Sequence, residues 1–258
     1  LDMSDFEAMS DDVLAQRCGG DAEAALRLKN VLEPEIRRLD LVKIWNLAMS
    51  VLPILAEVGG VGMYVDIEGL KQRASDTDDK GVGTWLKREK SDLEALLEIE
   101  NLKSHQQLSR VLYKKLKAVP LRKTTQGWST DRLSLYWARL KATEASNNSL
   151  VDILNRLVEY GVQKKLHETY YTGWLEEIGT DQRIHSCYSL GRTSTGRLAS
   201  FSTNLQNIPK AVRELVIPSP GYDYIVSSDQ AGIELRAAAH ISQDQTLLSW
   251  IKNKVDSH

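Results

Sequence analysis

Apolar residues recur three and four positions apart in three long stretches of the chain. These stretches run from Leu41 to Leu55, from Trp85 to Ile99 and from Leu150 to Trp174. Such spacing predicts helices, and in the third stretch it marks a buried stripe along one face. We therefore expect a largely helical fold in which the second helix pairs with the long third one.

Shorter segments predict a helix end, two strands and a further helix. The glycine-rich segment 59–66 is expected to break the first helix, in which Pro53 predicts a kink. Segments 183–190 and 222–226 alternate between apolar and polar residues, as β-strands do. Strong helix formers from Ile233 to His240 predict a helix soon after the second strand.

The composition is ordinary for a globular chain of one or two domains. Of its 258 residues, 42% are hydrophobic and 26% are charged. No uninterrupted run of about 18 apolar residues is present, so no membrane partner is expected. Cys18 and Cys187 match no metal-binding spacing, which predicts free thiols in a reducing compartment.

Positive charge is concentrated in one segment, although the net charge is −2. Residues 101–125 hold seven bases and no acid, a composition that suits contacts with phosphates. A solvated helix face would have the same composition. Ser104 is expected to cap a helix here and to place backbone amides near a phosphate. The candidate phosphate-binding residues are Lys103, Ser104, Lys114, Lys115, Lys117 and, on the long third helix, Lys164.

The most informative chemistry lies near the end of the chain. Asp229 follows the second predicted strand, and Glu234 lies in the helix that comes next. A carboxylate beside a helix amino terminus is well placed to hold a hard cation that carries phosphates. Upstream, the segments 193–200 and 204–209 are rich in hydroxyl and amide side chains, which suit hydrogen bonding into a groove. A polar surface loop would explain their composition equally well.

These segments resemble the start of the palm in family A DNA polymerases, the group of bacterial DNA polymerase I and phage replicases. The family's common form of the last motif begins Asp-Tyr-Ser-Gln, whereas Gln230, Ala231 and Gly232 follow Asp229 here, which is closer to the phage members. Residues 256–258 resemble the family's Asp-x-His at the base of the fingers. The three palm motifs, in the family's order, are TSTGRLAS (193–200), NLQNIP (204–209) and DQAGIELRAAAHISQD (229–244).

The resemblance implies an α+β fold in which a helical thumb is followed by the start of a polymerase palm, an antiparallel sheet with helices, so that the right-hand fold is incomplete. Arg17 stands in place of the tyrosine of the family's exonuclease motif, so no nuclease activity is assigned to Asp21. The implied domains are the end of a 3′–5′ exonuclease-like domain (1–40), the thumb and connecting helices (41–180), the first part of the palm (181–250) and the start of the fingers (251–258).

The resemblance also implies catalysis by two Mg²⁺ ions. Asp229 would be one of the two ligands that bridge them, and the backbone carbonyl of Gln230 would be a further ligand. A later His-Asp-Glu motif absent from this chain would supply the second carboxylate. Glu234 would obstruct the 2′-hydroxyl of a ribonucleotide.

Further residues would hold the substrates. Arg197, Gln206 and Asn207 would read the minor groove at the primer terminus, where every base pair presents acceptors. His258 would contact the triphosphate of the incoming nucleotide.

We therefore expect part of a DNA-directed DNA polymerase that catalyses template-directed nucleotidyl transfer. Its partners would be primer-template DNA and deoxynucleoside triphosphates. Because the fingers and the second palm motif are missing, the chain alone is expected to be inactive, and a complementing C-terminal polymerase chain would restore activity if it is half of a split enzyme. The alternative is a non-catalytic module that binds duplex DNA. The expected location is the cytoplasm of a bacterial or phage-infected cell, with an organelle as an open alternative.

Overall fold

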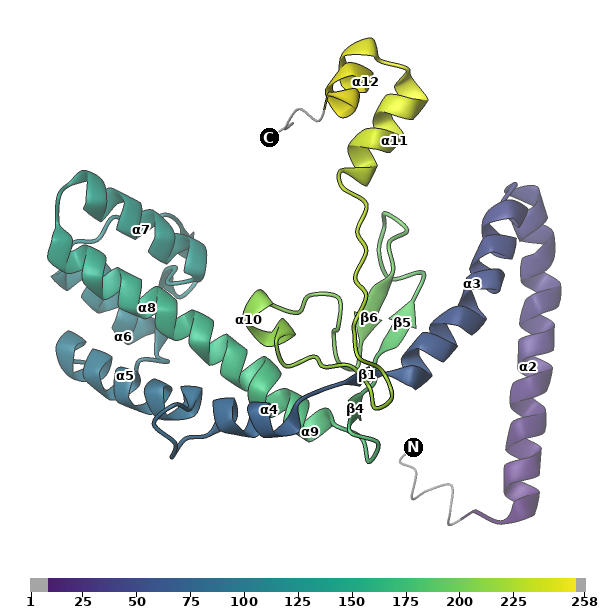
Figure 1. The fold of residues 1–258 in the computed structure, drawn as a ribbon, viewed down its shortest axis with the longest axis horizontal. Coiled ribbons are helices and arrows are strands. Elements are labelled where there is room, and N and C mark those ends of the chain that lie inside the picture. The colour runs from purple at the N-terminus through teal and green to yellow at the C-terminus, as the bar shows by residue number, and fades with distance from the viewer. Residues whose placement is uncertain (1–8, 254–258) are drawn as a thin grey trace. The chain divides into compact units, whose positions relative to one another are not determined.

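The structure, a computed structural model, describes residues 9–253 (Figure 1). The chain forms two compact units, Leu1–Val216 and Ile217–His258. Helices dominate, and the strands of the described part form three antiparallel pairs. This mixture confirms the predicted α+β class. The predicted domain boundaries at residues 40, 180 and 250 remain predictions.

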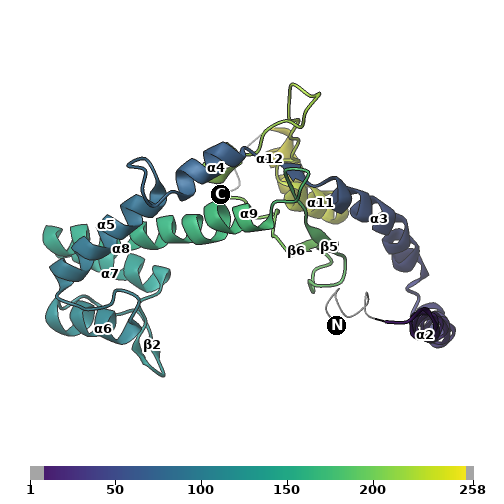
Figure 2. The same cartoon turned by 90° about the horizontal axis from the view of Figure 1, so that it is seen from below.

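The first unit contains most of the helices. They are α2 (Asp11–Arg38), α3 (Val42–Val61), α4 (Ile67–Ala74), α5 (Val82–Leu97), α6 (His105–Arg110), η1 (Val111–Lys115), α7 (Arg132–Glu144), α8 (Asn148–Leu166), η2 (His167–Thr172), α9 (Gly173–Glu177) and α10 (Lys210–Arg213). The two η elements are single stretches of π-helix. Because α8, η2 and α9 follow one another directly, they form one long helical segment, which Figure 2 shows from α8 to α9.

The strands of this unit are short. The pairs are β1 (Met63–Tyr64) with β4 (Arg183–Ile184), β2 (Lys123–Thr124) with β3 (Gly127–Trp128), and β5 (Cys187–Ser189) with β6 (Ala199–Phe201). Segment 183–190, predicted as one strand, thus forms β4 and β5 with a break between them. At this break the Ser186 hydroxyl donates to the Thr203 carbonyl at 2.7 Å, which ties the strand to the loop after β6.

Two hydrophobic cores lie in the first unit. The first joins α5, α6, η1, α7 and α8, and the second joins α4, η2, α9, β1, β4 and the segment after α10. The long helical segment contributes to both, with Leu154 in the first core and Trp174 in the second. The predicted pairing of α5 with α8 is confirmed, and Arg156 of α8 donates to Glu89 of α5 at 2.7 Å.

The first predicted helix ends later than its glycines suggest. α3 continues through Gly59 and Gly60 and stops before Gly62, whose φ of +65° is left-handed. A Cβ at Gly62 would lie 2.8 Å from the His185 ring, so glycine is needed there for the close approach of β4. His185 Nδ1 also lies 2.9 Å from the Gly59 carbonyl, near the carboxyl end of the helix. The end of α3 is therefore set by a contact between distant segments.

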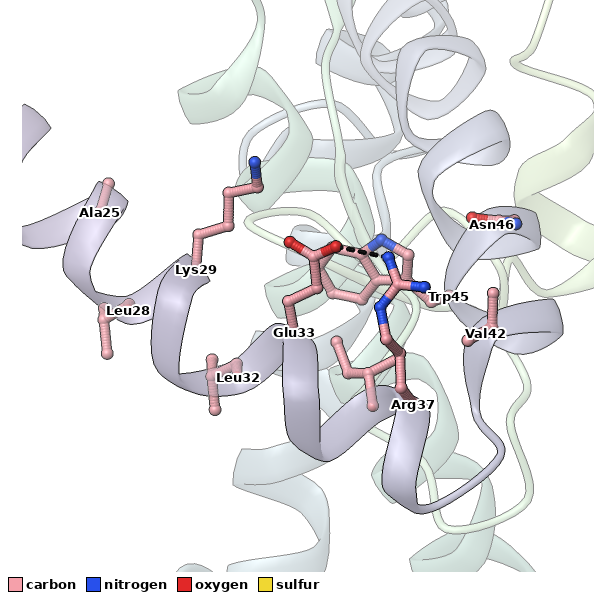
Figure 3. Close-up of a pocket in the computed structure, with 10 residues that line it drawn as sticks. Ala25, Leu28, Lys29, Leu32, Glu33, Arg37, Val42, Trp45 and Asn46 are labelled. Atoms are coloured by element: carbon pink, nitrogen blue, oxygen red, sulfur yellow. Dashed lines mark hydrogen bonds and ion pairs between the residues drawn. The ribbon is translucent and has the colours of Figure 1, made fainter.

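The helices α2 and α3 enclose an apolar pocket of about 500 Å³ (Figure 3). Trp45 of α3 and Leu32 of α2 are among the residues that line it, and an ion pair of 2.8 Å joins Glu33 to Arg37 on α2. Hydrogen bonding from Arg37, and then its charge, lower the pKa of Glu33.

By length and composition α3 is also apolar enough to cross a membrane, which the sequence prediction missed because polar residues interrupt the run. A single helix of this kind is weak evidence for a membrane, and α3 has no buried residue, unlike the core helix of a soluble protein.

The second unit has an extended segment followed by α11 (Ile233–Ser242) and α12 (Gln245–Lys252). α11 matches the predicted helix. Asp244 begins α12 by accepting hydrogen bonds from the backbone amides of Thr246 and Leu247 at 2.8 and 3.0 Å.

The strand predicted at 222–226 is not formed. Tyr224 and Val226 are 83% and 91% exposed. A strand depends on hydrogen bonds to a neighbouring strand, and no strand of the described part pairs with this segment. The prediction was wrong because alternation in the sequence supplies no partner.

Tyr113, in the first core, should make stability fall at alkaline pH. Its hydroxyl donates to the Ser129 carbonyl at 2.5 Å, and burial raises its pKa to about 12. An unfolded tyrosine has a pKa of about 10, so between about pH 10 and 12 unfolding releases a proton. This contribution is complete below about pH 10 and is lost as the pH rises to about 12, by at most about 1.4 kcal/mol per pH unit. In urea titrations across this range, Tyr113→Phe should weaken the decrease, and an identical decrease in both proteins would contradict the assignment.

Candidate functional site

Asp229 lies in the extended segment that leads into α11. Its side chain is exposed and makes no hydrogen bond or ion pair within residues 9–253. The turn after it is held by Arg236, whose Nε donates to the Ala231 carbonyl at 2.8 Å. The Arg236 backbone amide also donates to the Gly232 carbonyl at 3.0 Å. The Asp229 carboxylate is thus left open to a cation.

Glu234 occupies the first turn of α11. Gly232 precedes the helix with a φ of +60°, a left-handed conformation that glycine adopts without strain. A carboxylate in the first turn is also stabilised by the helix dipole. The local sequence therefore places Asp229 and Glu234 at the same end of α11.

This end of α11 offers hard oxygen donors of the kind that Mg²⁺ prefers. The exposed Asp229 carboxylate fits that chemistry, and the backbone carbonyl of Gln230 is a second oxygen donor next to it. Nowhere in the described ranges do three acidic, histidine or cysteine side chains gather into one group. Asp229 and Gln230 would thus supply only part of a coordination shell.

The loop between β5 and β6 carries Arg197 in the first unit. The Thr193 hydroxyl donates to the Arg197 carbonyl at 2.7 Å, and Gly196 turns the chain with a φ of +75°. Arg192 stacks its guanidinium over the Phe201 ring of β6 at 4.0 Å. These contacts shape a tight polar turn in which Arg197 is exposed.

Gln206 is fixed by its own side chain. Its Oε1 accepts a hydrogen bond from the Ser200 backbone amide at 2.8 Å, and its backbone amide donates to Asn204 Oδ1 at 3.0 Å. The Ser200 hydroxyl also donates to Asn204 Oδ1 at 3.0 Å. Within residues 9–253 only the oxygen of the Gln206 side-chain amide is bonded, so its NH₂ group has no acceptor there and can serve as a donor.

Tyr170 of η2 positions the neighbouring Asn207. The Tyr170 hydroxyl donates to the Asn207 carbonyl at 2.8 Å, and burial raises the pKa of Tyr170. Tyr170 also meets Trp174 edge to face, with ring centroids 5.7 Å apart. The buried pair of Tyr170 and Trp174 thus supports the polar loop through the hydrogen bond from Tyr170 to Asn207.

A cleft of about 440 Å³ lies between the long helical segment and the loop of residues 202–209 after β6, which we call the amide-rich loop. Lys165 and Thr169 line it from the helix, and Asn204 and Asn207 line it from the loop. Lys164, the predicted residue, instead lies 3.9 Å from Glu168. Lys165, the next basic residue of the long helix, is the one that lines the cleft, and the phosphate-binding role of Lys164 stays a prediction.

The basic residues at 101–125 belong to an exposed end of the first unit that we call the tip segment (residues 101–131). Ser104 accepts from the Gln107 backbone amide at 3.4 Å, so its predicted capping role in α6 is confirmed. Lys115 pairs with Glu98 at 2.6 Å. The bases with no ion-pair partner among residues 9–253 are Lys103, Arg110, Lys114, Lys117 and Lys123.

Apart from Lys164 on α8, the described predicted site residues fall into three groups: Asp229, Gln230 and Glu234 at the start of α11, Arg197 with the amide-rich loop, and the tip segment. The first group belongs to the second unit and the other two belong to the first. His258 lies outside the described residues.

Comparisons with known proteins agree with the motifs. The model of DNA polymerase family A matches residues 75–258. DNA polymerase I of Caldicellulosiruptor bescii is 31% identical over 97% of this chain and 29% of that protein. DNA polymerase I of Bacillus subtilis is 31% identical over 96% of this chain and 28% of that protein.

A solved structure gives the same result. The POL domain of Pol1 from M. smegmatis, in complex with DNA primer-template and dNTP, is 28% identical with a TM-score of 0.79, over 91% of this chain and 41% of that one. The chain spans less than a third of the length of the two DNA polymerase I relatives. Since the family model covers well over half of the chain, the protein belongs to DNA polymerase family A.

Proposed function

We propose that this chain is part of a DNA-directed DNA polymerase that transfers nucleotides under the direction of a template. The observation that carries the proposal is the exposed Asp229 carboxylate at the start of α11, inside a motif of the matched family. We also propose, from the bacterial relatives, that it acts in the cytoplasm of a bacterial or phage-infected cell.

Divalent metal ions, when bound, would neutralise the charge that develops on the transferring phosphate. Asp229 and the Gln230 carbonyl would hold such an ion. Glu234, in the first turn of the same helix, would close the space beside the sugar of the incoming nucleotide. Ribonucleotides would then be rejected in favour of deoxyribonucleotides, because the Glu234 side chain would occupy the space that a 2′-hydroxyl needs.

The amide-rich loop would hold the primer end. Acceptors in the minor groove are present on every base pair, so donors such as the free NH₂ of Gln206 report pairing geometry and not sequence. Asn207 and Arg197 would act in the same way. Lys165, which lines the cleft beside this loop, would neutralise a nearby backbone phosphate.

Activity is proposed to require more of the polymerase than this chain. The chain spans 29% of the Caldicellulosiruptor protein, and residues 9–253 contain no group of three potential metal ligands. We therefore propose that a C-terminal polymerase polypeptide complements it. Titrating the purified chain with a separately expressed downstream half and measuring primer extension tests this idea, which fails if no activity is restored.

A non-catalytic module that grips duplex DNA is the second candidate. The basic tip segment and the incomplete set of metal ligands favour it. A complemented assembly distinguishes the two candidates. A polymerase part would support primer extension, whereas a binding module would still bind duplex DNA but would never extend a primer.

Neutralising Lys114 and Lys117 should make duplex binding less sensitive to salt. Each phosphate contact that is lost lowers the slope of log K against log[salt] by about 0.9. Lys115→Ala is the matched control, since the Lys115 ammonium is paired with Glu98 and should change the slope less. Fluorescence anisotropy with a labelled duplex at several salt concentrations measures these slopes. Equal slopes for the double variant and the unchanged chain would mean that these lysines face solvent.

A further inference from the structure

Helix α7 carries apolar side chains on two opposite sides. Its buried side faces the first core with Leu135, Ala138 and Ala142, and Figure 1 shows α7 lying alongside α8. About half a turn away around the helix, Leu133 and Leu140 are 62% and 50% exposed. These two leucines are seven residues apart and therefore project from the same side. A helix that served only the core would have polar residues in their place.

Two aromatic residues beside the exposed leucines hold cations over their rings. The guanidiniums of Arg132 and Arg139 lie 5.4 and 4.8 Å from the centroid of the Tyr136 ring. The Lys141 ammonium lies 4.8 Å from the centroid of the Trp137 ring. Cation–π contacts of this kind hold long basic side chains in defined positions.

These side chains together form a surface that we call the outer face of α7. Its centre is a row of apolar residues four and three positions apart, and its edge is basic. The members of the outer face are Leu133, Trp137 and Leu140 at the centre, with Arg132, Tyr136 and Arg139 along the edge.

The two arginines of the outer face are available to carboxylates. Arg132 donates to the Tyr136 hydroxyl at 3.2 Å, and Arg139 donates to Asn155 Oδ1 of α8 at 3.1 Å, so both acceptors are neutral. Neither arginine has an ion-pair partner within the described ranges. Because a guanidinium has five N–H donors, each arginine retains donors that can bind a carboxylate in a bidentate manner.

Charge and shape together identify the kind of partner that fits this face. A second copy of the chain would bring the same two arginines against like charges, which disfavours self-association. A DNA backbone would match the arginines, but its phosphates would lie against the exposed leucines and would leave them without apolar contacts. An amphipathic helix with apolar residues along one side and acids beside them satisfies both the apolar centre and the basic edge.

We propose that the outer face of α7 binds an acidic amphipathic helix of a partner protein. Tryptophan, tyrosine and arginine are the residue types that most often dominate the binding energy of protein interfaces, and the outer face presents all three. The face contains none of the residues assigned to catalysis or to DNA, and it lies outside the tip segment. The inference therefore goes beyond the proposed function and does not depend on it.

A designed peptide is the probe for this surface. A labelled amphipathic peptide of about 18 residues, with leucines three and four positions apart and glutamates beside them, is long enough to form a helix. Fluorescence anisotropy with the whole chain should show saturable binding that weakens as the salt concentration rises. The same peptide with lysine in place of every glutamate should not bind.

Substitutions at the centre of the outer face should weaken binding of the glutamate peptide. Leu140→Ala should raise its Kd at least about fivefold and Trp137→Ala about 30-fold, as is typical of residues that dominate an interface. Leu96→Ala is the matched control, because Leu96 of α5 is 49% exposed, like Leu140, and lies outside the outer face. It should bind normally, and circular dichroism of each variant checks that the helices persist.

The basic edge is tested separately. Replacing both Arg132 and Arg139 with glutamine should remove most of the salt dependence of peptide binding, because the charged donors to the glutamates are lost. Arg88→Gln is the control, since Arg88 is already paired with Asp79 at 2.6 Å, and it should leave the salt dependence unchanged.

Three outcomes would overturn the proposal. The first is that the glutamate peptide does not bind, or binds Leu140→Ala as tightly as the unchanged chain. The second is self-association in sedimentation velocity that Leu140→Ala abolishes, which would make the outer face a contact between two copies. The third is a loss of duplex DNA affinity in the Arg132 and Arg139 double variant while peptide binding is unaffected, which would assign the arginines to nucleic acid.

Discussion

Replacing Asp229 with alanine should reduce primer extension by a complemented enzyme at least about 100-fold, while duplex affinity changes by less than about twofold. The carboxylate is exposed and has no partner within residues 9–253, so its removal disturbs no packing or internal hydrogen bond. What is lost is a ligand for a cation that would neutralise charge in the transition state. Extension rates at several Mg²⁺ and Mn²⁺ concentrations, with duplex binding measured in parallel, give the two quantities.

The control for this prediction lies in the same extended segment. Asp223 is also an exposed carboxylate, six residues upstream of Asp229, and Asp223→Ala removes the same charge from the same unit. It should extend primers at the normal rate. Equal losses for both variants would show that general charge, and not a ligand position, matters, and normal extension by Asp229→Ala would overturn the assignment.

Helices were predictable because their signals are local. The spacing of apolar residues located α5, α8 and α9, and Ser104 was recognised as the cap of α6 from its residue type. Each of these features depends on residues within a turn or two. The pairing of α5 with α8 followed because both helices carry an apolar stripe to bury.

Features that depend on distant segments were not predictable in this way. The end of α3 at Gly62 follows from the approach of His185, more than 120 residues later in the chain. The segment 222–226 alternates like a strand, yet no strand within the described ranges pairs with it. Sequence pattern gives the preference of a segment, and its neighbours decide whether that preference is realised.

The candidate site shows the same division. Asp229 and Glu234 were found because one short motif holds both. The basic pair Lys164 and Lys165 was recognisable on the long helix, but which of the two lines the cleft was not, since one residue along a helix rotates a side chain by about 100°. The hydrogen bond from Tyr170 to the Asn207 carbonyl joins segments 37 residues apart, so no local sequence pattern predicts it.

Replacing Glu234 with alanine should raise ribonucleotide incorporation relative to deoxyribonucleotide incorporation by about 10- to 100-fold in the complemented enzyme. Alanine is the strongest helix former, so α11 should persist, and circular dichroism of the variant checks this. The substitution removes both the bulk and the negative charge of the side chain at the first turn of the helix.

The isosteric variant Glu234→Gln separates shape from charge. If a 2′-hydroxyl is excluded because the side chain fills the space, glutamine should preserve sugar selectivity while alanine loses it. If the negative charge is responsible, both variants should lose selectivity. Competition assays with matched rNTP and dNTP pairs measure the ratio of incorporation efficiencies, and an unchanged ratio for Glu234→Ala would show that Glu234 is a solvated helix residue without a role in sugar choice.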